Sequence, residues 1–541
     1  MTERRRLSFI MPLLLALLMA VPLFAVVASL FTTGEQSLWT AWGTVFPLYG
    51  VNTLILLAMV SAMSGSIGIS TAWLISAARF PGRALFSWML ILPLAAPAYV
   101  LAYLYTELLS FSGPVQSLLR DSFGWQAGSY WFPEIRSLPG AALMLSLVLY
   151  PYIYLLARAA FARQGAQSWM AARSLGSSPL QAFRRVALPM ARPAIAGGLA
   201  LVMMETLADY GVADYFAIPT FSTGIFRTWL AMGDKILALQ LAAMMLGIVA
   251  LLVMLEILSR RGRTDSGARS TAPAPRLPLS AGHAVLAWAL CGTPILLGFL
   301  LPVGLLAHMA LTTGDPLPAA TLAEYAWNTA RVAVIAAGIA TFIAIVLAYA
   351  ARRSNGPLTR SGIRLSTLGY ALPGALLAIG LLAPLASMDQ QLTRWLRDSF
   401  GWSGGLILTG TITVLVYALV IRFLTVSYNS ISSGLSSVSP AMDAAARSLG
   451  ASPSRVVRQI HLPIIRSSLG AGALLVMIDV LRELPATLIL RPFNFETLAT
   501  RVYRLASDER LAEASTAALL IVALGLIPVI LINRLSDQRS Q

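Results

Sequence analysis

Four carboxylates stand in stretches of the chain that are otherwise apolar, and their spacing is repeated. Glu205 and Asp209 are four residues apart, and Asp479 and Glu483 repeat this spacing 274 residues later. Side chains four residues apart lie on the same face of a helix. Carboxylate oxygens are the ligands that hard cations prefer, so the two pairs are candidates for lining a path or gate.

A structural interpretation of the same residues stays open. Ionisable groups within an apolar span are costly and usually face a bundle interior or a water-filled path. Arg482 stands next to Glu483 and supplies one positive charge. It could offset one carboxylate while the others are protonated or hydrogen-bonded at a helix interface. The pattern predicts interior positions for all five residues and no firm metal site.

A second duplicated segment combines a glycine with two later prolines. The final proline follows the glycine by thirteen positions in both copies. Glycine accepts the left-handed conformation that ends a helix, and proline is favoured in the first turn of the next. The matched residues are Ala171, Ala172, Gly176, Pro179 and Pro189 in the first copy and Ala445, Ala446, Gly450, Pro453 and Pro463 in the second.

We expect each copy to form a short helix–turn–helix that the final proline ends. Its apolar edge could dock in a groove of another protein. A helix that rests on lipid headgroups is the alternative, but two copies with matched spacing favour docking. The apolar edge consists of Leu180, Phe183, Val186, Val456, Val457 and Ile460.

The sequence lacks the residue patterns of an enzyme. ATP hydrolysis requires a phosphate-binding loop of the form GxxxxGK[ST]. The only lysine is Lys235, and Asp234 precedes it. Cys291 stands alone, and the three histidines show no metal-ligand spacing. We therefore expect no catalytic residue and no cofactor, with ATP bound by a separate subunit.

The composition indicates a polytopic membrane protein. Of the 541 residues, 57% are hydrophobic and 11% are charged, too few charges to cover a soluble protein of this length. A helix needs about 20 residues to cross the hydrocarbon core. About twelve stretches qualify, and the expected fold is all-α; the stretches are 10–30, 51–78, 84–106, 138–157, 194–216, 236–255, 284–307, 332–351, 365–388, 406–421, 469–490 and 514–533.

The basic residues predict the orientation of the chain. The net charge of +16 could suggest a nucleic-acid partner. However, most of the 39 basic residues fall in alternate loops, those that are cytoplasmic if the N-terminus is inside. This is the positive-inside asymmetry, so we expect both termini in the cytoplasm, lipid around the chain and no nucleic acid. No small-residue cleavage site closes the first apolar run, which favours an uncleaved helix over a signal peptide.

The chain is an internal duplication. Asn52-Thr53 recurs as Asn328-Thr329, and residues 118–125 resemble residues 395–402. Each half holds an even number of spans, so the two six-helix repeats are parallel, and a substrate path would run between them. The expected units are a first domain at 1–258, a cytoplasmic linker at 259–280 and a second domain at 281–541, with the duplicated loops at about 164–192 and 438–466.

The duplicated loops resemble the EAA loop of ABC importer permeases, the coupling helix that sits in a cleft of the ATPase subunit. Residues 205–225 and 483–503 resemble the two halves of the fused ferric-iron permeases, and the resemblance covers nearly the whole chain. It implies the type I ABC importer permease fold in the bacterial inner membrane, with ferric iron as the substrate. It also implies two copies of an ABC ATPase subunit and an extracytoplasmic substrate-binding protein as partners.

One departure concerns the acidic residue that names the motif. Met170 and Ala444 occupy its position, and Asp443 stands one place early in the second copy. The departure weakens the expectation of a salt bridge from the loop to the ATPase and leaves the docking surface intact. Fused permeases for thiamine or another small solute are the alternative within the family. A secondary transporter driven by an ion gradient is the alternative from another class, and it has no use for paired docking loops.

Overall fold

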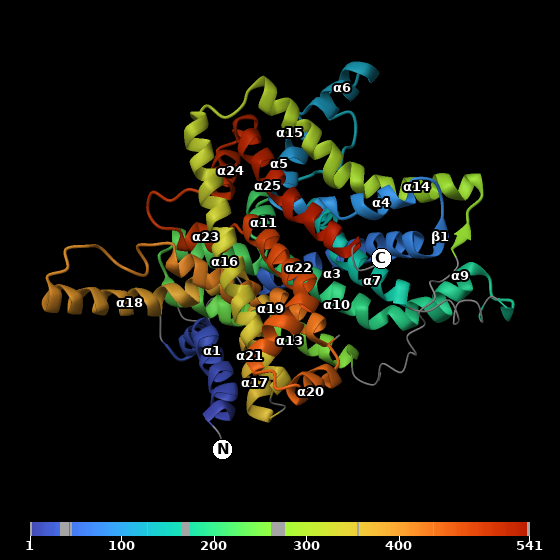
Figure 1. Cartoon of the computed structure of the whole chain (residues 1–541). Helices are drawn as coiled ribbons and strands as arrows, with labels where there is room; N and C mark the ends of the chain where they lie inside the picture. Colours follow the sequence, from blue (N-terminus) through green and yellow to red (C-terminus); the bar gives the residue numbers. More distant parts are fainter. Residues whose placement is uncertain are drawn as a thin grey trace.

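The computed structural model describes residues 3–32, 43, 46–126, 128–163, 172, 174–260, 276–353, 356–436 and 438–537, which fold into helices joined by short connections (Figure 1). The first half contains α1 (Glu3–Ala28), η1 (Ser29–Phe31), α3 (Phe46–Ala77), β1 (Ala78–Arg79), α4 (Arg83–Met89), η2 (Leu92–Ala95), α5 (Ala98–Leu109), α6 (Pro114–Phe123), α7 (Leu138–Arg163), α9 (Pro179–Ala182), η3 (Phe183–Ala187), α10 (Leu188–Ala208), α11 (Gly211–Tyr215), α12 (Phe221–Phe226), η4 (Arg227–Ala231) and α13 (Lys235–Arg260). The second half contains β2 (Leu277–Pro278), α14 (Ala281–Ile295), η5 (Leu296–Leu300), α15 (Leu301–Thr312), α16 (Ala319–Arg353), α17 (Pro357–Ser366), η6 (Leu368–Ala371), α18 (Gly374–Phe400), α19 (Thr413–Ser436), α20 (Pro440–Ser448), α21 (Pro453–Val456), η7 (Val457–His461), α22 (Leu462–Leu481), α23 (Pro485–Leu490), α24 (Leu498–Ser507) and α25 (Leu511–Asp537).

The helices confirm the predicted all-α membrane fold. Within the described residues, eleven helices are long and apolar enough to cross a membrane, and a bent pair raises the number to twelve. The eleven are Ile10–Phe31, Phe46–Ala77, Leu138–Ala162, Leu180–Ala208, Lys235–Leu255, Ala281–Thr312, Ala319–Arg353, Gly374–Phe400, Thr413–Ser436, Ser454–Leu481 and Leu511–Ile532.

Prolines break two of the predicted spans. Arg83–Ala95 and Ala98–Phe123 meet at an angle of 91°. Ala96 adopts an extended conformation before Pro97, because the residue before a proline avoids the helical region. Leu372 is extended before Pro373 in the same way. The continuous helices predicted at 84–106 and 365–388 are therefore wrong, and each is a bent or interrupted segment.

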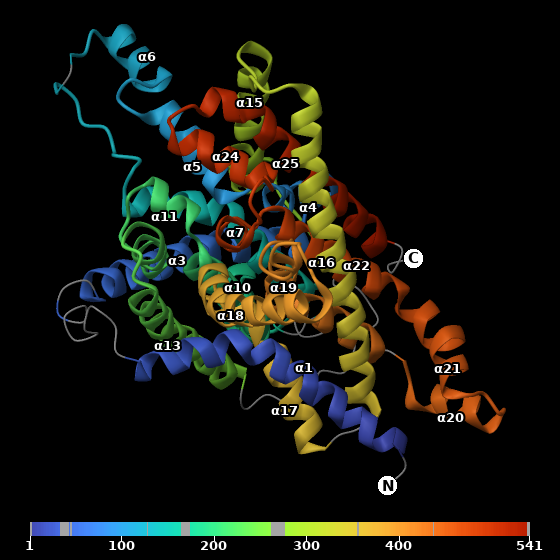
Figure 2. The same cartoon turned by 90° about the vertical axis from the view of Figure 1, so that its left-hand side faces the viewer.

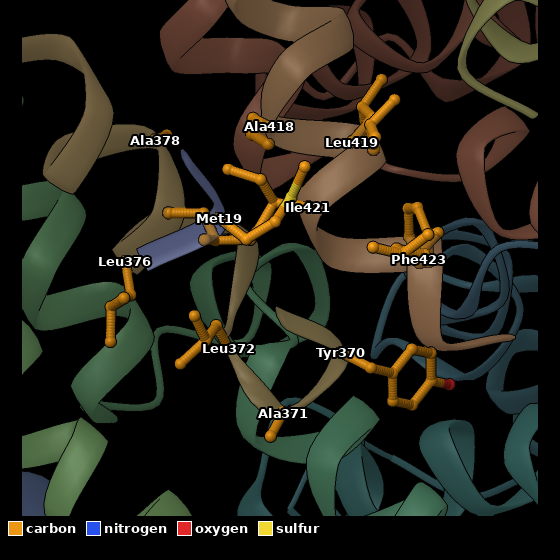
Figure 3. Close-up of a cluster of buried hydrophobic side chains, with 14 of the residues drawn as sticks. Met19, Tyr370, Ala371, Leu372, Leu376, Ala378, Ala418, Leu419, Ile421 and Phe423 are labelled. Atoms are coloured by element: carbon orange, nitrogen blue, oxygen red, sulfur yellow. The ribbon is translucent and has the colours of Figure 1, made fainter. Parts of the chain in front are cut away.

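The first helix of the chain packs on the second half. α1 lies along α17 and α18, which belong to the other repeat (Figure 2). Figure 3 shows Met19 of α1 among second-half side chains, including Leu376, Ala418 and Ile421. The hydroxyl of Tyr417 on α19 donates a hydrogen bond to the carbonyl oxygen of Leu18.

The first helices of the second half pack on the first half in return. α14 and η5 contact α3, α4 and α7. The Trp288 indole donates to the carbonyl oxygen of Pro81 at 3.0 Å, and the Tyr105 hydroxyl donates to that of Leu297 at 2.7 Å. Each half therefore packs its first helices on the other half, and these contacts tie the two halves together.

The duplicated Asn-Thr pairs make the same contact in both halves. The Asn52 side chain donates to the carbonyl oxygen of Pro219 at 3.1 Å, and Asn328 donates to that of Glu496 at 3.1 Å. A capping box opens the helix that follows each contact, α12 in the first half and α24 in the second. The internal repeat is therefore present in the three-dimensional structure as well as in the sequence.

The linker predicted at 259–280 lies mostly outside the described residues. Its described end forms β2, which pairs in parallel with β1, with Ala78 opposite Leu277. The Leu279 amide donates to the carbonyl oxygen of Arg79 at 3.2 Å. The start of the second half is therefore hydrogen-bonded to the segment that follows α3.

Candidate functional site

Two helix breaks position the predicted carboxylates. α10 ends at Ala208, so Glu205 is helical whereas Asp209 is extended. α22 ends at Leu481, so Asp479 is helical and Glu483 lies beyond the end. The expectation that each pair shares one face of a helix is therefore wrong, because the helix ends between its two members. The two pairs still correspond in the structure, because in each half a helix ends between the two carboxylates.

The second carboxylate of each pair caps a short helix. The Asp209 carboxylate accepts hydrogen bonds from the amides of Val212 and Ala213 at 3.2 Å, at the start of α11. The Glu483 carboxylate accepts one from the amide of Ala486 at 3.2 Å, at the start of α23. Negative charge is favourable at a helix N-terminus, where amides lack partners. Asp209 and Glu483 therefore have a structural role, as the second interpretation of the sequence allowed, although helix capping itself was not predicted.

The carboxylate of Asp479 belongs to a network that joins the halves. Arg482 Nη2 lies 2.6 Å from Asp479 Oδ1. The hydroxyl of Tyr152 on α7 donates to Asp479 at 3.1 Å and also contacts Arg482. Arg482 further donates to the carbonyl oxygen of Leu94 at 3.4 Å. Arg482, which the sequence assigned to the second-half pair, therefore anchors that pair to the first half.

Arg422 completes the cluster and was missed from the sequence. It lies in the middle of α19, is almost fully buried, and pairs with Glu483 at 2.8 Å and with Glu205 at 3.7 Å. The signal was available, because Arg422 is a charge within an apolar run. The predicted span at 406–421 stopped one residue before it, and the helix runs from Thr413 to Ser436.

The structure brings all five predicted residues to one cavity between the halves. Glu205, Asp209, Asp479, Arg482 and Glu483 line a space of about 70 Å³ together with Arg422. Four carboxylates and two guanidiniums leave a formal excess of negative charge. Both guanidiniums belong to the second half. The first half supplies neither, because Val148 and Ala208 occupy the corresponding positions. Such a site can attract a cation to its oxygen atoms and repels an anion.

The duplicated loops contain the predicted left-handed glycines. Gly176 has φ of 82° and Gly450 has φ of 77°. In the second copy the amides of Gly450 and Ala451 donate to the carbonyl oxygens of Arg447 and Ala446, and this pair of bonds closes a helix with a Schellman motif. In the first copy the amide of Ser177 donates to the carbonyl oxygen of Ala172. The turns are therefore as predicted.

The helices after these turns differ from the prediction. Pro179 and Pro453 begin α9 and α21, as expected. Pro189 and Pro463 lie in the first turns of α10 and α22, and the helix continues through them, so the expected end at the final proline is wrong. The π-helical turns η3 and η7 precede these prolines in both copies. A π-helical turn leaves room for the proline ring and its missing N–H, and the chain stays helical.

The predicted apolar edge is exposed only in part, with Leu180 58% exposed. Leu175 and Leu449, which correspond to each other, are 85% and 86% exposed at the tips of the turns. Val456 is buried, and Phe183 packs against Trp73 with ring centroids 4.7 Å apart. Ala446 and Ala172 are buried, Ala445 is exposed, and Ala171 lies outside the described residues.

Asp443 is bound within the chain. Arg352 at the end of α16 donates to the Asp443 carboxylate at 2.9 Å, and His461 Nε2 lies 2.6 Å from it. Tyr349 lies 3.0 Å from the other ring nitrogen of His461. Burial raises the pKa of Asp443, but the bonds from His461 and Arg352 outweigh burial and hold the pKa below its ordinary value. Asp443, the acidic residue one place before the motif position, therefore ties α20 to the end of α16.

The comparison with protein families agrees with this architecture. Residues 64–264 and 340–541 each match the family described as the binding-protein-dependent transport system inner membrane component. The chain belongs to this family. It is a multi-pass inner membrane permease of an ABC transporter, with two copies of the family's domain, and is not itself the ATPase.

Several relatives span most of the chain. The Fe(3+)-transport system permease protein FbpB 2 of Haemophilus influenzae is 26% identical over 488 residues, which cover 89% of each protein. The probable ABC transporter permease protein y4fN of Sinorhizobium fredii is 24% identical and covers 97% of this chain and 95% of its own. The sulfate transport system permease protein CysT of Salmonella typhimurium is 28% identical over 38% of this chain and 72% of its own.

Proposed function

We propose that this permease imports ferric iron. The observation that carries the proposal is the cavity between the halves, in which four carboxylates outnumber two guanidiniums. Hard cations prefer oxygen ligands, and a small cavity with excess negative charge suits a metal ion. The similarity to FbpB 2 over most of both chains supports the same substrate class.

The charge of the cavity also argues against an anionic substrate. CysT is a sulfate permease by name and matches 38% of this chain. An oxyanion would approach four carboxylates here, and like charges at close range in a poorly hydrated site repel strongly. Thiamine or another small solute is the second candidate within the family. The present volume of about 70 Å³ favours an ion over an organic molecule.

The proposed arrangement places the energy source on the cytoplasmic side. Residues 1–258 and 281–541 form the two permease domains, joined by the linker at 259–280, and both termini are cytoplasmic by the positive-inside asymmetry. We call the two turns at Gly176 and Gly450 the coupling turns. One ATPase subunit docks on each of them, where the side chains of Leu175 and Leu449 are exposed. A binding protein on the opposite side delivers the substrate, which passes Glu205 and its neighbours on the way in.

A substrate panel tests the proposal. The permease is reconstituted in proteoliposomes with its ATPase and with the binding protein loaded in turn with ferric iron, thiamine or sulfate. We expect ATP-dependent accumulation of radioactive iron and background levels of the other two solutes. Accumulation of thiamine or sulfate without iron would contradict the assignment of ferric iron and would leave the ABC permease class intact.

A further inference from the structure

One loop of the second half exposes an aromatic side chain that its first-half counterpart buries. Phe493 and Phe216 correspond by the offset of 277 residues. Phe493 is 94% exposed, whereas Phe216 is 4% exposed. The next residue is left-handed in both loops, with φ of 61° at Asn494 and 53° at Ala217. The backbone turn is thus shared, and only the second half directs its phenylalanine outward.

The exposed phenylalanine stands on a braced loop. Arg491 Nη1 lies 2.6 Å from Glu496 Oε1 and donates to the carbonyl oxygen of Phe495 at 3.1 Å. The Phe495 amide donates to the carbonyl oxygen of Pro492 at 3.2 Å, and the Phe495 ring is buried. Asparagine tolerates the left-handed conformation that Asn494 adopts, so the turn that presents Phe493 is stable in itself. A rigid aromatic side chain loses little entropy on binding and is the type of residue that anchors interfaces.

The loop lies on the face of the membrane opposite the coupling turns. It borders a groove of about 660 Å³ whose other wall includes Thr321, Glu324 and Tyr325 of α16. The other end of α16 carries Arg352, which binds Asp443 of the coupling helix α20. The rise from residue 324 to residue 352 is about 42 Å at 1.5 Å per residue, more than the hydrocarbon thickness of about 30 Å. Figure 2 shows α24, which follows the loop, far from α20 and α21.

The loop is also linked to the cavity between the halves. α23 is only six residues long. Its first residue, Pro485, lines the cavity with Glu483, and its Leu488 lines the groove beside Phe493. A displacement of the loop would therefore be carried by one short helix to the ion pair between Glu483 and Arg422.

We propose that Phe493 is the anchor by which the second half seats the substrate-loaded binding protein, in an apolar pocket of that protein, and that α23 transmits the contact to the Glu483–Arg422 pair. This inference rests on the proposed function only for the identity of the substrate, because dependence on a binding protein is a property of the family. The matched loop of the first half makes no such contact, since Phe216 is buried.

A fluorescent probe tests the contact directly. Cys291 is buried and is the only cysteine, so Phe493→Cys offers a single accessible thiol for an environment-sensitive dye. Trp131→Cys is the matched control, because Trp131 is 86% exposed on another connection. In the assembled complex we expect the loaded binding protein to shift the emission at position 493 and to leave position 131 unchanged. A dye at position 493 that brominated lipid quenches and the binding protein does not affect would place the loop in the membrane interface and overturn the proposal.

A kinetic measurement tests the contribution of Phe493 to the stimulation of ATP hydrolysis. Phe493→Ala should leave assembly and basal ATP hydrolysis unchanged, because the side chain has few contacts within the chain. We expect the concentration of binding protein that half-maximally stimulates hydrolysis to rise about tenfold or more, the typical loss at an aromatic anchor. Stimulation equal to that of the wild type would overturn the role of Phe493 and leave the permease function intact. Absence of stimulation in the wild type would instead contradict both the role of Phe493 and the permease function.

Discussion

Arg422 Nη1 lies 2.8 Å from Glu483 Oε2, and its other terminal nitrogen lies 3.7 Å from Glu205 Oε2. One guanidinium of the second half therefore pairs with a carboxylate from each half. All three side chains lie at the cavity between the halves, and Arg422 is the residue that holds them together. The consequences of removing each partner differ and can be measured separately.

Removal of the guanidinium should be destabilising. Arg422→Gln leaves two carboxylates without their cation in a buried site, which typically costs about 3–5 kcal/mol. We expect a lower midpoint of thermal unfolding in detergent. Arg458→Gln, at an exposed position of the coupling loop, is the control and should not shift the midpoint. The double variant Arg422→Gln, Glu483→Gln should recover part of the loss, and equal midpoints for Arg422→Gln and the wild type would show that the pair does not stabilise the fold.

Neutralising Glu205 should affect transport more than stability. Its carboxylate is 16% exposed and makes a single 3.7 Å ion pair among the described residues, so its oxygen atoms are available to a passing cation. We expect Glu205→Gln to lower iron uptake roughly tenfold, the effect of about 1.4 kcal/mol, with the complex still assembled. Glu134→Gln, at an exposed position outside the cavity, should transport like the wild type. Unchanged uptake by Glu205→Gln would exclude Glu205 from the path.

The two capping carboxylates can be tested together. Asp209→Asn keeps an oxygen that accepts from the amide of Val212, and Glu483→Gln keeps one for Ala486. If the carboxylates contribute charge to the path, the double variant should show reduced uptake while it still assembles and binds its loaded partner. A drop in assembly or thermal stability, with unchanged transport per complex, would show that their role is structural alone.

The glycines of the coupling turns should be needed for ATPase binding. A residue with a β-carbon pays about 1–2 kcal/mol in the left-handed conformation, and a β-branched residue more. We expect Gly176→Val or Gly450→Val to reduce co-purification of the ATPase without loss of membrane insertion, and the double variant to be worse than either. Gly338→Val is the control, because a β-carbon there meets no atom within 4 Å and the backbone is helical. Wild-type association in both single variants would contradict the role of the turns.

The Asp443 network should make the second coupling loop sensitive to acid. The folded-state pKa of Asp443 is lowered, so its contribution is present above its unfolded pKa of about 4 and is lost as the pH falls through the folded value. At neutral pH, Asp443→Asn should loosen α20 by about 2 kcal/mol, the usual worth of bonds to a charged group. Hydrogen exchange of α20 should be faster in the variant at pH 7, and the difference should shrink below about pH 4. A difference that persists in acid would contradict this mechanism.

Repetition in the sequence made much of this architecture predictable. The number of spans, the two halves, the left-handed turns at Gly176 and Gly450 and the shared cavity of the four carboxylates all follow from patterns that occur twice. The helix breaks after Ala208 and Leu481 were not predicted, because an apolar run does not reveal where capping side chains will replace helical hydrogen bonds. The π-helical turns before Pro189 and Pro463 were missed because a proline was taken to end the helix, and the sequence does not show where a helix continues through one.

Features that occur in only one half gain no support from a comparison of the halves. Arg422, whose counterpart is Val148, was missed altogether, whereas Arg482 and Asp443 were singled out as charges and only their partners were not predicted. The packing of α1 on the opposite half depends on long-range contacts that no local pattern encodes. The same limit applies to Phe493, whose exposure distinguishes it from Phe216 although residue type and backbone conformation agree.

The most direct measurement of the permease assignment is ATP hydrolysis and iron uptake in proteoliposomes, with this chain alone and with its partners. The chain alone should neither hydrolyse ATP nor accumulate iron under an imposed proton or sodium gradient. Addition of the ATPase subunit and the iron-loaded binding protein should produce both activities together. Uptake by the chain alone, driven by the ion gradient, would contradict the account and identify a secondary transporter.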